Sequence, residues 1–300
     1  MFVREECISK LVFLQFEVQQ GNIKANFEQV KKSLAILGPS AYSLIALPDM
    51  WATGFVYEDL ATLSLEIPQL LQDLEHLAQA YNIVLAGSLP WQETGADGRE
   101  RLTNRQFFSG SGQEKIPAID KQHLFSFWKE DQWFQSGKYA EPVHIGAKSI
   151  VGGLVCYDLR FPDAARLQCR QGAEIILVSA QWPLARIAQW QILLQARAIE
   201  NQCFIVAANA CGRWGNLQLG GHSMVISPDG TILVEAGETQ ESVVMECNLE
   251  VQKELRERFN TVAPTPWSKD DSRKIYTLNR LKQVVRNRKR IGQTIVFTNG

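Results

Sequence analysis

The stretch VGGLVCYDLRFPDAARL, residues 151–167, decides the fold of this chain. Small and apolar residues from Val151 to Val155 predict a buried strand, and the residues after Cys156 predict a sharp turn and then a helix. Cys156 would therefore lie at the end of a sheet, beside backbone N–H groups at the start of a helix. Such surroundings lower the pKa of a thiol and can hold an oxyanion. A buried cysteine with a purely structural role is the commoner alternative, so the rest of the chain must decide between the two.

Bulk composition narrows the classes of function. The chain has 300 residues, 45% of them hydrophobic and 21% charged, which suffices for a sizeable core. Its net charge of −1 gives no global sign of nucleic-acid or membrane binding. No apolar run approaches the ~20 residues of a membrane span, and the N-terminal segment lacks a signal-peptide cleavage site. We therefore expect no membrane association and no nucleic-acid partner.

Cysteine and histidine usage points to a reducing compartment and away from metals. The six cysteines form no CxxC pair, so we expect reduced thiols in a cytoplasmic protein. The four histidines are scattered without HxH or HxxxH spacing, so no metal site is expected. The chain has no glycine-rich phosphate loop or dinucleotide fingerprint, and no cofactor is expected.

Strand-like and helix-like segments alternate along the chain. Continuous apolar runs typical of strands buried on both faces occur at Tyr42–Leu47, Asn82–Leu89, Glu174–Ala180 and Phe204–Ala210. Helical spacing of apolar residues occurs at Asn22–Leu37, Ile67–Tyr81 and Ile187–Asn201. The pattern predicts an α/β layered domain with helices covering the faces of sheets.

Antiparallel pairing is expected between some neighbouring segments. Residues 92–104 are interpreted as a polar turn, and Arg105–Ser109 is expected to pair with Glu114–Ile119 through the glycines of residues 110–112. A second hairpin is expected around Pro228-Asp229-Gly230.

Reactive side chains follow the ends of several predicted strands. They are Asp49, Lys121, Cys156 and the pair Gln181-Trp182. Because α/β domains bind ligands beyond the carboxyl ends of their strands, these residues are expected to share one rim. A thiol, a carboxylate and a lysine there suit hydrolysis of an amide through a thioester. Asp49 could equally be an ordinary turn residue, and the aromatic residues of 125–137 could line a pocket or simply pack a loop.

Four motifs in order, with two supporting segments, resemble the nitrilase superfamily of carbon–nitrogen hydrolases, nearest its omega-amidase branch. They are LPDMWATGF (47–55), IDKQHLF (119–125), GGLVCYDLRFP (152–162) and SAQWP (179–183), supported by ARAIENQ (196–202) and HSMVISPDGTI (222–232). The resemblance implies a four-layer αββα sandwich over residues 8–262, followed by a basic C-terminal extension, 263–300. It implies a small amide substrate, water as the second reactant, and a homodimer.

The resemblance also assigns roles to residues. It implies Cys156 as the nucleophile, Lys121 as the lysine that stabilises the oxyanion, and Glu130 as a second, positioning glutamate. The backbone N–H of Tyr157 would complete the oxyanion hole. Candidates for the wall of the substrate pocket are Phe55, Phe125, Phe127, Trp128, Gln181 and Trp182.

Asp49 departs from the family pattern, which has glutamate at the position of the base. Aspartate is one methylene shorter, and a misplacement of ~1 Å can cost about 100-fold in rate. Two functions therefore remain open: an active amidase that releases ammonia, and a catalytically impaired binding or regulatory protein on the same scaffold.

The C-terminal extension carries an unusual charge. Residues 269–300 hold nine Lys and Arg against two Asp, a balance of +7. Polyanion binding is one interpretation, but an arm docked on the acidic body or on a partner subunit is favoured.

Overall fold

The computed structural model describes residues 7–38, 42–95, 97–138 and 140–262. Two six-stranded mixed sheets dominate it. The first has the order β14 (Glu241–Glu246), β1 (Lys10–Gln15), β2 (Ser43–Ala46), β3 (Val84–Thr94), β4 (Glu100–Ser109), β5 (Ala118–Asp120). The second has the order β13 (Ile232–Glu235), β12 (Met224–Ile226), β9 (Phe204–Asn209), β8 (Ile175–Ala180), β7 (Ser149–Val155), β6 (Val143–Ile145).

The two sheets share one internal plan. Each has three parallel strands at its centre, β1-β2-β3 and β7-β8-β9, with antiparallel strands on both sides. The connecting helices are α1 (Ile23–Leu37), α2 (Leu60–Leu63) and α3 (Ile67–Tyr81) in the first half, and α4 (Pro162–Arg170) and α5 (Ile187–Asn201) in the second. A further helix, α6 (Glu250–Arg258), follows β14, and β10 (Arg213–Trp214) pairs with β11 (Leu217–Gln218).

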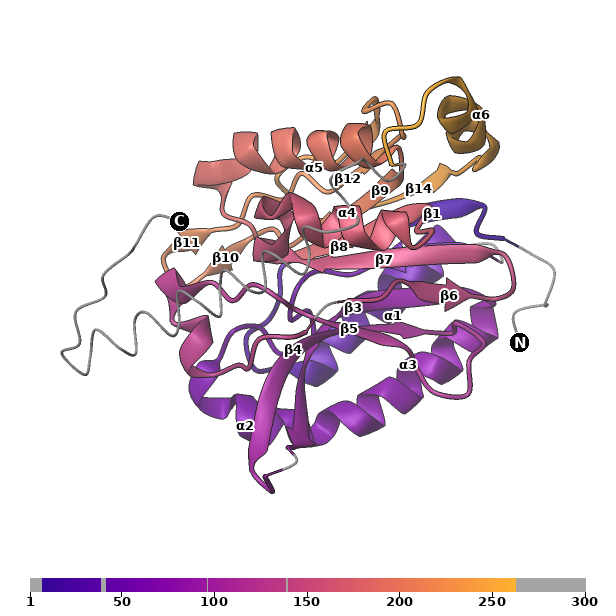
Figure 1. The fold of residues 1–300 in the computed structure, drawn as a ribbon. Coiled ribbons are helices and arrows are strands. Elements are labelled where there is room, and N and C mark those ends of the chain that lie inside the picture. The colour runs from indigo at the N-terminus through magenta and orange to yellow at the C-terminus, as the bar shows by residue number, and fades with distance from the viewer. Residues whose placement is uncertain (1–6, 39–41, 96, 139, 263–300) are drawn as a thin grey trace, which may run out of the picture. The chain divides into compact units, whose positions relative to one another are not determined.

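Alternating side chains build the layers. In β1, Leu11 and Phe13 face the core between the two sheets, whereas Val12 and Leu14 face the core under α1 and α3. In β8, Ile175 and Leu177 likewise face the other sheet, whereas Ile176 and Val178 face α4 and α5. Figure 1 shows the resulting order, with α1 and α3 outside one sheet and α4 and α5 outside the other. The predicted αββα sandwich is confirmed.

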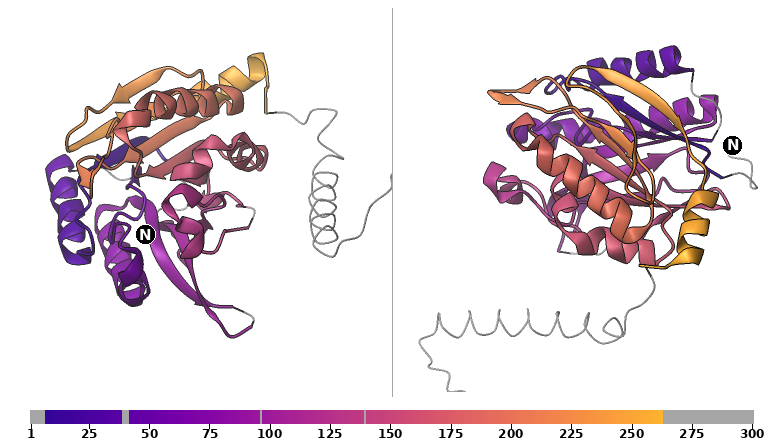
Figure 2. Two further views of the ribbon diagram at one scale, coloured as in Figure 1. Left: turned by 90° about the vertical axis from the view of Figure 1, so that its left-hand side faces the viewer. Right: turned by 90° about the horizontal axis from the view of Figure 1, so that it is seen from above.

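The prediction of a polar turn over residues 92–104 is wrong for most of that range. Only the tip is a turn, because β3 continues to Thr94 and β4 begins at Glu100, and the two strands run past the rest of their sheet (Figures 1 and 2). Polar cross-strand pairs hold this extension, for example Thr94 with Glu100 at 2.6 Å. The predicted pairing of Arg105–Ser109 with Glu114–Ile119 is confirmed only in part. The strand that pairs with β4 is Ala118–Asp120, and residues 114–117 form no strand.

The glycine pair Gly152-Gly153 allows close approach of side chains to β7. The side-chain amide of Gln168, on α4, accepts a hydrogen bond from Gly153 N at 2.8 Å and donates to Gly153 O at 2.9 Å. On the other face a Cβ at residue 153 would collide with Oε1 of Gln106. The strand that carries the cysteine is therefore clamped from both sides.

The expected extension 263–300 lies outside the described residues. Within 7–262, apart from the short gaps, no helix is long and apolar enough to cross a bilayer.

Candidate active site

Cys156 lies where the sequence predicts, directly after β7 and at the start of the 3₁₀ turn η5 (Cys156–Arg160). Its backbone φ is +48°, a conformation that costs energy for a residue with a Cβ. The side chain is 9% exposed. A strained strand-to-helix turn of this kind lifts the thiol out of the sheet toward a crevice.

Asp158 fixes this turn to the loop that carries the lysine. Its buried carboxylate accepts hydrogen bonds from the backbone N–H groups of Val155 (3.2 Å), Gln122 (3.2 Å) and His123 (2.8 Å). The His123 ring nitrogen Nδ1 lies 2.8 Å from the same carboxylate. Two segments more than thirty residues apart in sequence thus share one anchor.

Lys121 follows β5 and meets two carboxylates in the interior. Its ammonium nitrogen lies 2.7 Å from Glu130 Oε1 and 3.7 Å from Asp49 Oδ2, and all three side chains are at most 2% exposed. Glu130 begins the short turn η4 (Glu130–Gln132), and its Oε2 accepts a hydrogen bond from Phe125 N at 2.7 Å. The lysine therefore has a fixed position between two acids.

Asp49 lies just beyond β2 and is fully buried. Its Oδ1 accepts hydrogen bonds from Ser88 Oγ at 2.6 Å and Asn104 Nδ2 at 2.8 Å. Its Oδ2 has no hydrogen-bond donor among the described residues. The backbone of Asp49 is tied to the second sheet, since Gln181 Nε2 donates to Asp49 O at 2.8 Å. One carboxylate oxygen is thus held by two hydrogen bonds, while the other is buried without a hydrogen-bond donor among the described residues.

Burial and charge shift the proton affinities of this cluster. Burial raises the pKa of Asp49 above its ordinary value of 3.8, and the Lys121 ammonium opposes that rise only in part. Burial alone would lower the pKa of Lys121, but the charges of Glu130 and Asp49 together raise it above its ordinary value. The lysine is therefore a permanent cation at working pH.

The expectation of a lowered thiol pKa is wrong for the protein without substrate. Burial raises the pKa of Cys156 to about 12, and the nearby Asp49 charge adds to the rise, which Lys121 only partly offsets. The Lys121 charge and a backbone hydrogen bond from Gln181 lower the pKa of the thiol, but desolvation outweighs them. A proton acceptor is therefore needed when the thiol attacks.

A narrow crevice opens over Cys156. Its wall includes the predicted residues Phe125, Trp128, Gln181 and Trp182, and also Tyr157, Arg160, Pro183 and Arg186. The other two predicted pocket residues do not line this crevice. Phe55 is buried against Tyr57 and Trp214, and Phe127 is 77% exposed with its ring 5.8 Å from that of Phe125.

Ser88 and Asn104 hold the Asp49 carboxylate, although neither was predicted from the sequence. Ser88 stands on β3, which pairs with β2, and Asn104 stands on β4, which pairs with the other side of β3. For Ser88 the available signal was a polar residue within the otherwise apolar run VLAGSL, and the structure shows that this residue is fully buried.

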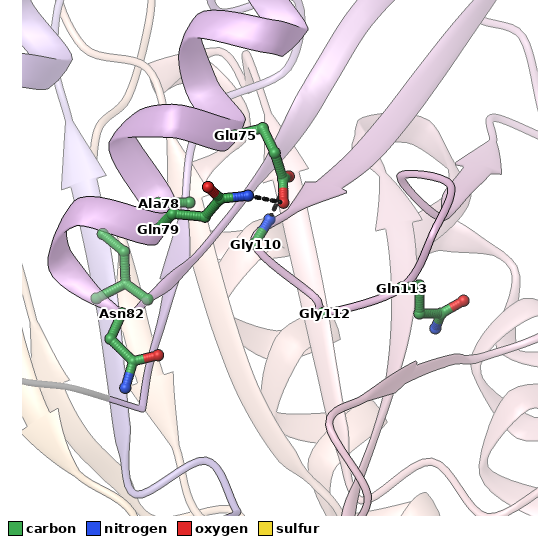
Figure 3. A pocket seen from close by; sticks show the side chains of 8 residues that line it. Glu75, Ala78, Gln79, Asn82, Gly110, Gly112 and Gln113 are labelled. Carbon is green, nitrogen blue, oxygen red and sulfur yellow. Dashed lines mark hydrogen bonds between the residues drawn. The ribbon is translucent and has the colours of Figure 1, made fainter. Parts of the chain in front are cut away.

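Other places offer less chemistry. A larger hollow of about 350 Å³ lies between α3 and the turn after β4 (Figure 3). Its Glu75 carboxylate already accepts hydrogen bonds from Gly110 N and Gln79 Nε2. In the described part of the chain, no three His, Cys, Asp or Glu side chains are grouped as metal ligands.

Known proteins resemble this chain over nearly the whole described region. The family model for carbon-nitrogen hydrolases matches residues 13–257. The chain is 32% identical over 247 residues to a 2-oxoglutaramate amidase of Bacillus subtilis, covering 81% of this chain and 92% of that protein. It is 32% identical over 253 residues to the omega-amidase YafV of Escherichia coli K12, covering 83% and 94%.

Solved structures agree with the fold. A carbon-nitrogen hydrolase superfamily protein of Xanthomonas campestris, with an arsenic adduct in its active site, is 27% identical with a TM-score of 0.74, covering 86% of this chain and 97% of its own. A mutant amidase of Nesterenkonia sp. AN1, which shows Michael addition of acrylamide at the active-site cysteine, is 25% identical with a TM-score of 0.69, covering 83% and 98%.

Proposed function

The chain belongs to the carbon-nitrogen hydrolase family, near its omega-amidase members, and from that premise we propose that it hydrolyses small ω-amides through a thioester on Cys156. The observation that carries the proposal is the buried cluster of Asp49, Lys121 and Glu130, in whose electrostatic field the Cys156 thiol lies. A cation between two acids beside a thiol is costly to bury and has little purpose in a simple core.

The first step joins sulfur to carbon. Cys156 Sγ attacks the amide carbonyl carbon while its proton passes to Asp49 Oδ2, the carboxylate oxygen that accepts no hydrogen bond from the described residues. Because the pKa of the thiol is about 12, Cys156 is protonated at neutral pH. The proton is therefore transferred as the sulfur attacks, and no stable thiolate forms beforehand. The raised pKa of Asp49 makes it a better acceptor than an exposed aspartate.

The negative charge that develops on the carbonyl oxygen is met by Lys121 Nζ and the backbone N–H of Tyr157. One oxygen of Glu130 pairs with the Lys121 ammonium, and the other accepts a hydrogen bond from Phe125 N. Glu130 therefore acts by positioning Lys121. Asp49 then returns its proton to the nitrogen, the C–N bond breaks, and ammonia leaves a thioester behind.

The second half repeats the chemistry with water. Asp49 takes a proton from water, which attacks the thioester carbon. The C–S bond breaks, the proton goes back to sulfur, and the carboxylic acid is released. The cycle needs no cofactor and consumes one amide and one water.

A distal carboxylate on the substrate has a partner at the mouth of the crevice. Arg160 is already occupied, because it donates to Gln189 Oε1 at 2.7 Å and its guanidinium carbon lies 4.6 Å from the centre of the Trp182 ring. Arg186 is exposed beside the same crevice, and its guanidinium carbon lies 5.9 Å from the ring centre of Phe125 and 6.0 Å from that of Phe127. A short dicarboxylate with one amide end would place its amide at Cys156 and its acid toward Arg186.

We also infer a cytoplasmic homodimer. All six cysteines are free thiols. On α5, Ile192 and Ile199 are 65% and 52% exposed and lie two helical turns apart, a surface that suits a second copy. Light scattering of the protein as it elutes from a sizing column tests this: a dimer is expected that I192E/I199E converts to a monomer, and a monomeric wild type contradicts it.

Ammonia release tests the proposed reaction. Purified protein is incubated with succinamate, 2-oxoglutaramate, neutral aliphatic amides and nitriles, and ammonia is measured with Cys156→Ala as the control. Turnover of the acidic amides, lost in the control, is expected. No turnover on the whole panel would contradict the proposal and favour the binding or regulatory role.

A further inference from the structure

Tyr57 has a ring that packs well and a hydroxyl that does not. It begins the short turn η1 (Tyr57–Asp59), eight residues after Asp49. Its ring stacks on Trp133, with centroids 5.9 Å apart and planes at 14°, and lies 5.9 Å from the ring of Phe55. The aromatic contacts hold the ring without any use of its hydroxyl.

The hydroxyl of Tyr57 is buried, and no hydrogen-bond partner for it exists among the described residues. A buried polar group without a partner costs about 1–3 kcal/mol. Native proteins rarely leave such a group in place, and those that do are candidates for a role in binding. The side chain as a whole is only half-buried, so a phenylalanine ring would fit there without that cost.

The charges of the active-site cluster act on this hydroxyl. Burial first, and then the charge of Glu130, raise the pKa of Tyr57, and Lys121, Asp49 and Cys156 also act on it. The Tyr57 ring lies edge-on to Trp214 at 6.5 Å, and Trp214 lies 4.9 Å from Trp128, which lines the Cys156 crevice. Trp214 thus connects the Tyr57 ring to a residue of the crevice wall.

We propose that Tyr57 is a further substrate-binding residue, whose buried hydroxyl forms a hydrogen bond with the amide group held at Cys156. The proposal rests on the proposed amidase function. A primary amide offers two N–H donors and a carbonyl acceptor, and a hydroxyl can both donate and accept. The phenol stays neutral at working pH, so it adds no charge near the carboxylates of Asp49 and Glu130.

The energetics give the proposal a distinctive signature. In the free protein the unpaired hydroxyl lowers the stability of the fold, and in the complex with substrate it gains a hydrogen-bond partner. Removing it should therefore leave the folded protein as stable as before or more stable, while it weakens substrate binding and turnover. A residue with a merely structural role would behave in the opposite way.

Tyr57→Phe tests this, with Tyr81→Phe as the matched control, because Tyr81 ends α3 and lies outside the crevice lining. We expect Tyr57→Phe to lower kcat/KM for the amide by about tenfold or more. The melting temperature should match or exceed that of the wild type. The Cys156→Ala protein should bind the intact amide more weakly when Tyr57→Phe is added.

Two results would overturn the inference. One is a Tyr57→Phe enzyme within twofold of wild type in kcat/KM, with an active wild type. The other is a lower melting temperature, which would mean that the hydroxyl has a partner in the free protein. If the wild type hydrolyses no amide at all, the proposed function fails first, and this inference fails with it.

Discussion

The ammonium of Lys121 lies 3.7 Å from Oδ2 of Asp49, with both side chains buried. The other oxygen of Asp49 is held by Ser88 and Asn104, so the carboxylate is fixed although it is one methylene shorter than the glutamate of the family pattern. These two hydrogen bonds therefore hold the shorter side chain in one orientation. The proposed catalysis depends on the other oxygen, Oδ2, which has no hydrogen-bond donor among the described residues.

Asp49→Asn should abolish proton transfer and keep the fold. We expect kcat/KM to fall by about 10²–10⁴, the usual contribution of a general base. Since the folded pKa of Asp49 is raised, its ionisation lowers stability as pH rises above 3.8, and the neutral amide removes that penalty. Thermal unfolding at neutral pH should show no loss of stability. Asp73→Asn, at a partly exposed position of α3 outside this cluster, is the control and should change neither quantity.

Asp49→Glu separates an active enzyme from an impaired one. The extra methylene must displace the carboxylate from Ser88 or Asn104, so we expect lower activity than that of the wild type. Steady-state kinetics on the best amide decide the matter. A large gain in activity would mean that the native chain is impaired at this position.

Lys121→Met should be costly in stability as well as in rate. The change leaves Glu130 and Asp49 buried without their cation, and loss of one partner of a buried pair costs about 3–5 kcal/mol. Urea unfolding measures the loss, which should shrink at acid pH as the carboxylates become protonated. Lys10→Met removes an ion pair with a 77% exposed partner, and it should cost no more than ~1 kcal/mol. Equal losses for the two variants would contradict the structure of the cluster.

The pH dependence should be set by Asp49 at the acid side and not by Cys156. Asp49 must be ionised to accept a proton, so kcat/KM should rise with pH through a pKa above 3.8. The thiol, with a pKa of about 12, should show no thiolate from neutral to mildly alkaline pH. Ultraviolet difference spectra between wild type and Cys156→Ala measure this. A thiolate that titrates near neutrality would be incompatible with proton transfer to Asp49 during attack.

Asp158→Ala should loosen the lysine loop from the nucleophile turn. It leaves the buried N–H groups of Val155, Gln122 and His123 without their acceptor, and each unpaired group costs about 1–3 kcal/mol. We expect a lower melting temperature and reduced kcat together. Asp163→Ala, on the exposed first turn of α4, is the control. An Asp158→Ala protein with unchanged kcat would show that the anchor is irrelevant to catalysis.

Much of the fold follows from local pattern. The central strands are buried on both faces, so their continuous apolar runs identify them, and the rule that ligands lie beyond strand ends places Asp49, Lys121 and Cys156 together. The extension of β3 and β4 was missed because its exposed residues are polar and only backbone pairing and cross-strand contacts hold it. Glu130 was expected from resemblance alone, since nothing in FSFWKEDQWFQSG distinguishes it from Asp131.

Details that depend on contacts between distant segments were beyond the sequence. Ser88 and Asn104 meet Asp49 only because β2, β3 and β4 are adjacent. The raised pKa of Cys156 reflects how deeply the turn is buried, which no local pattern reveals. Tyr57 is conspicuous only through the absence of a partner for its hydroxyl among the described residues.

The most direct test of the central claim is the intact mass of the protein after rapid acid quench during turnover of the best amide. We expect a species heavier than the free enzyme by the mass of the substrate less ammonia. Peptide mapping should place the added group on Cys156, and Cys156→Ala should form no such species. Ammonia release at an undiminished rate by Cys156→Ala, with no covalent species in the wild type, would contradict the central claim.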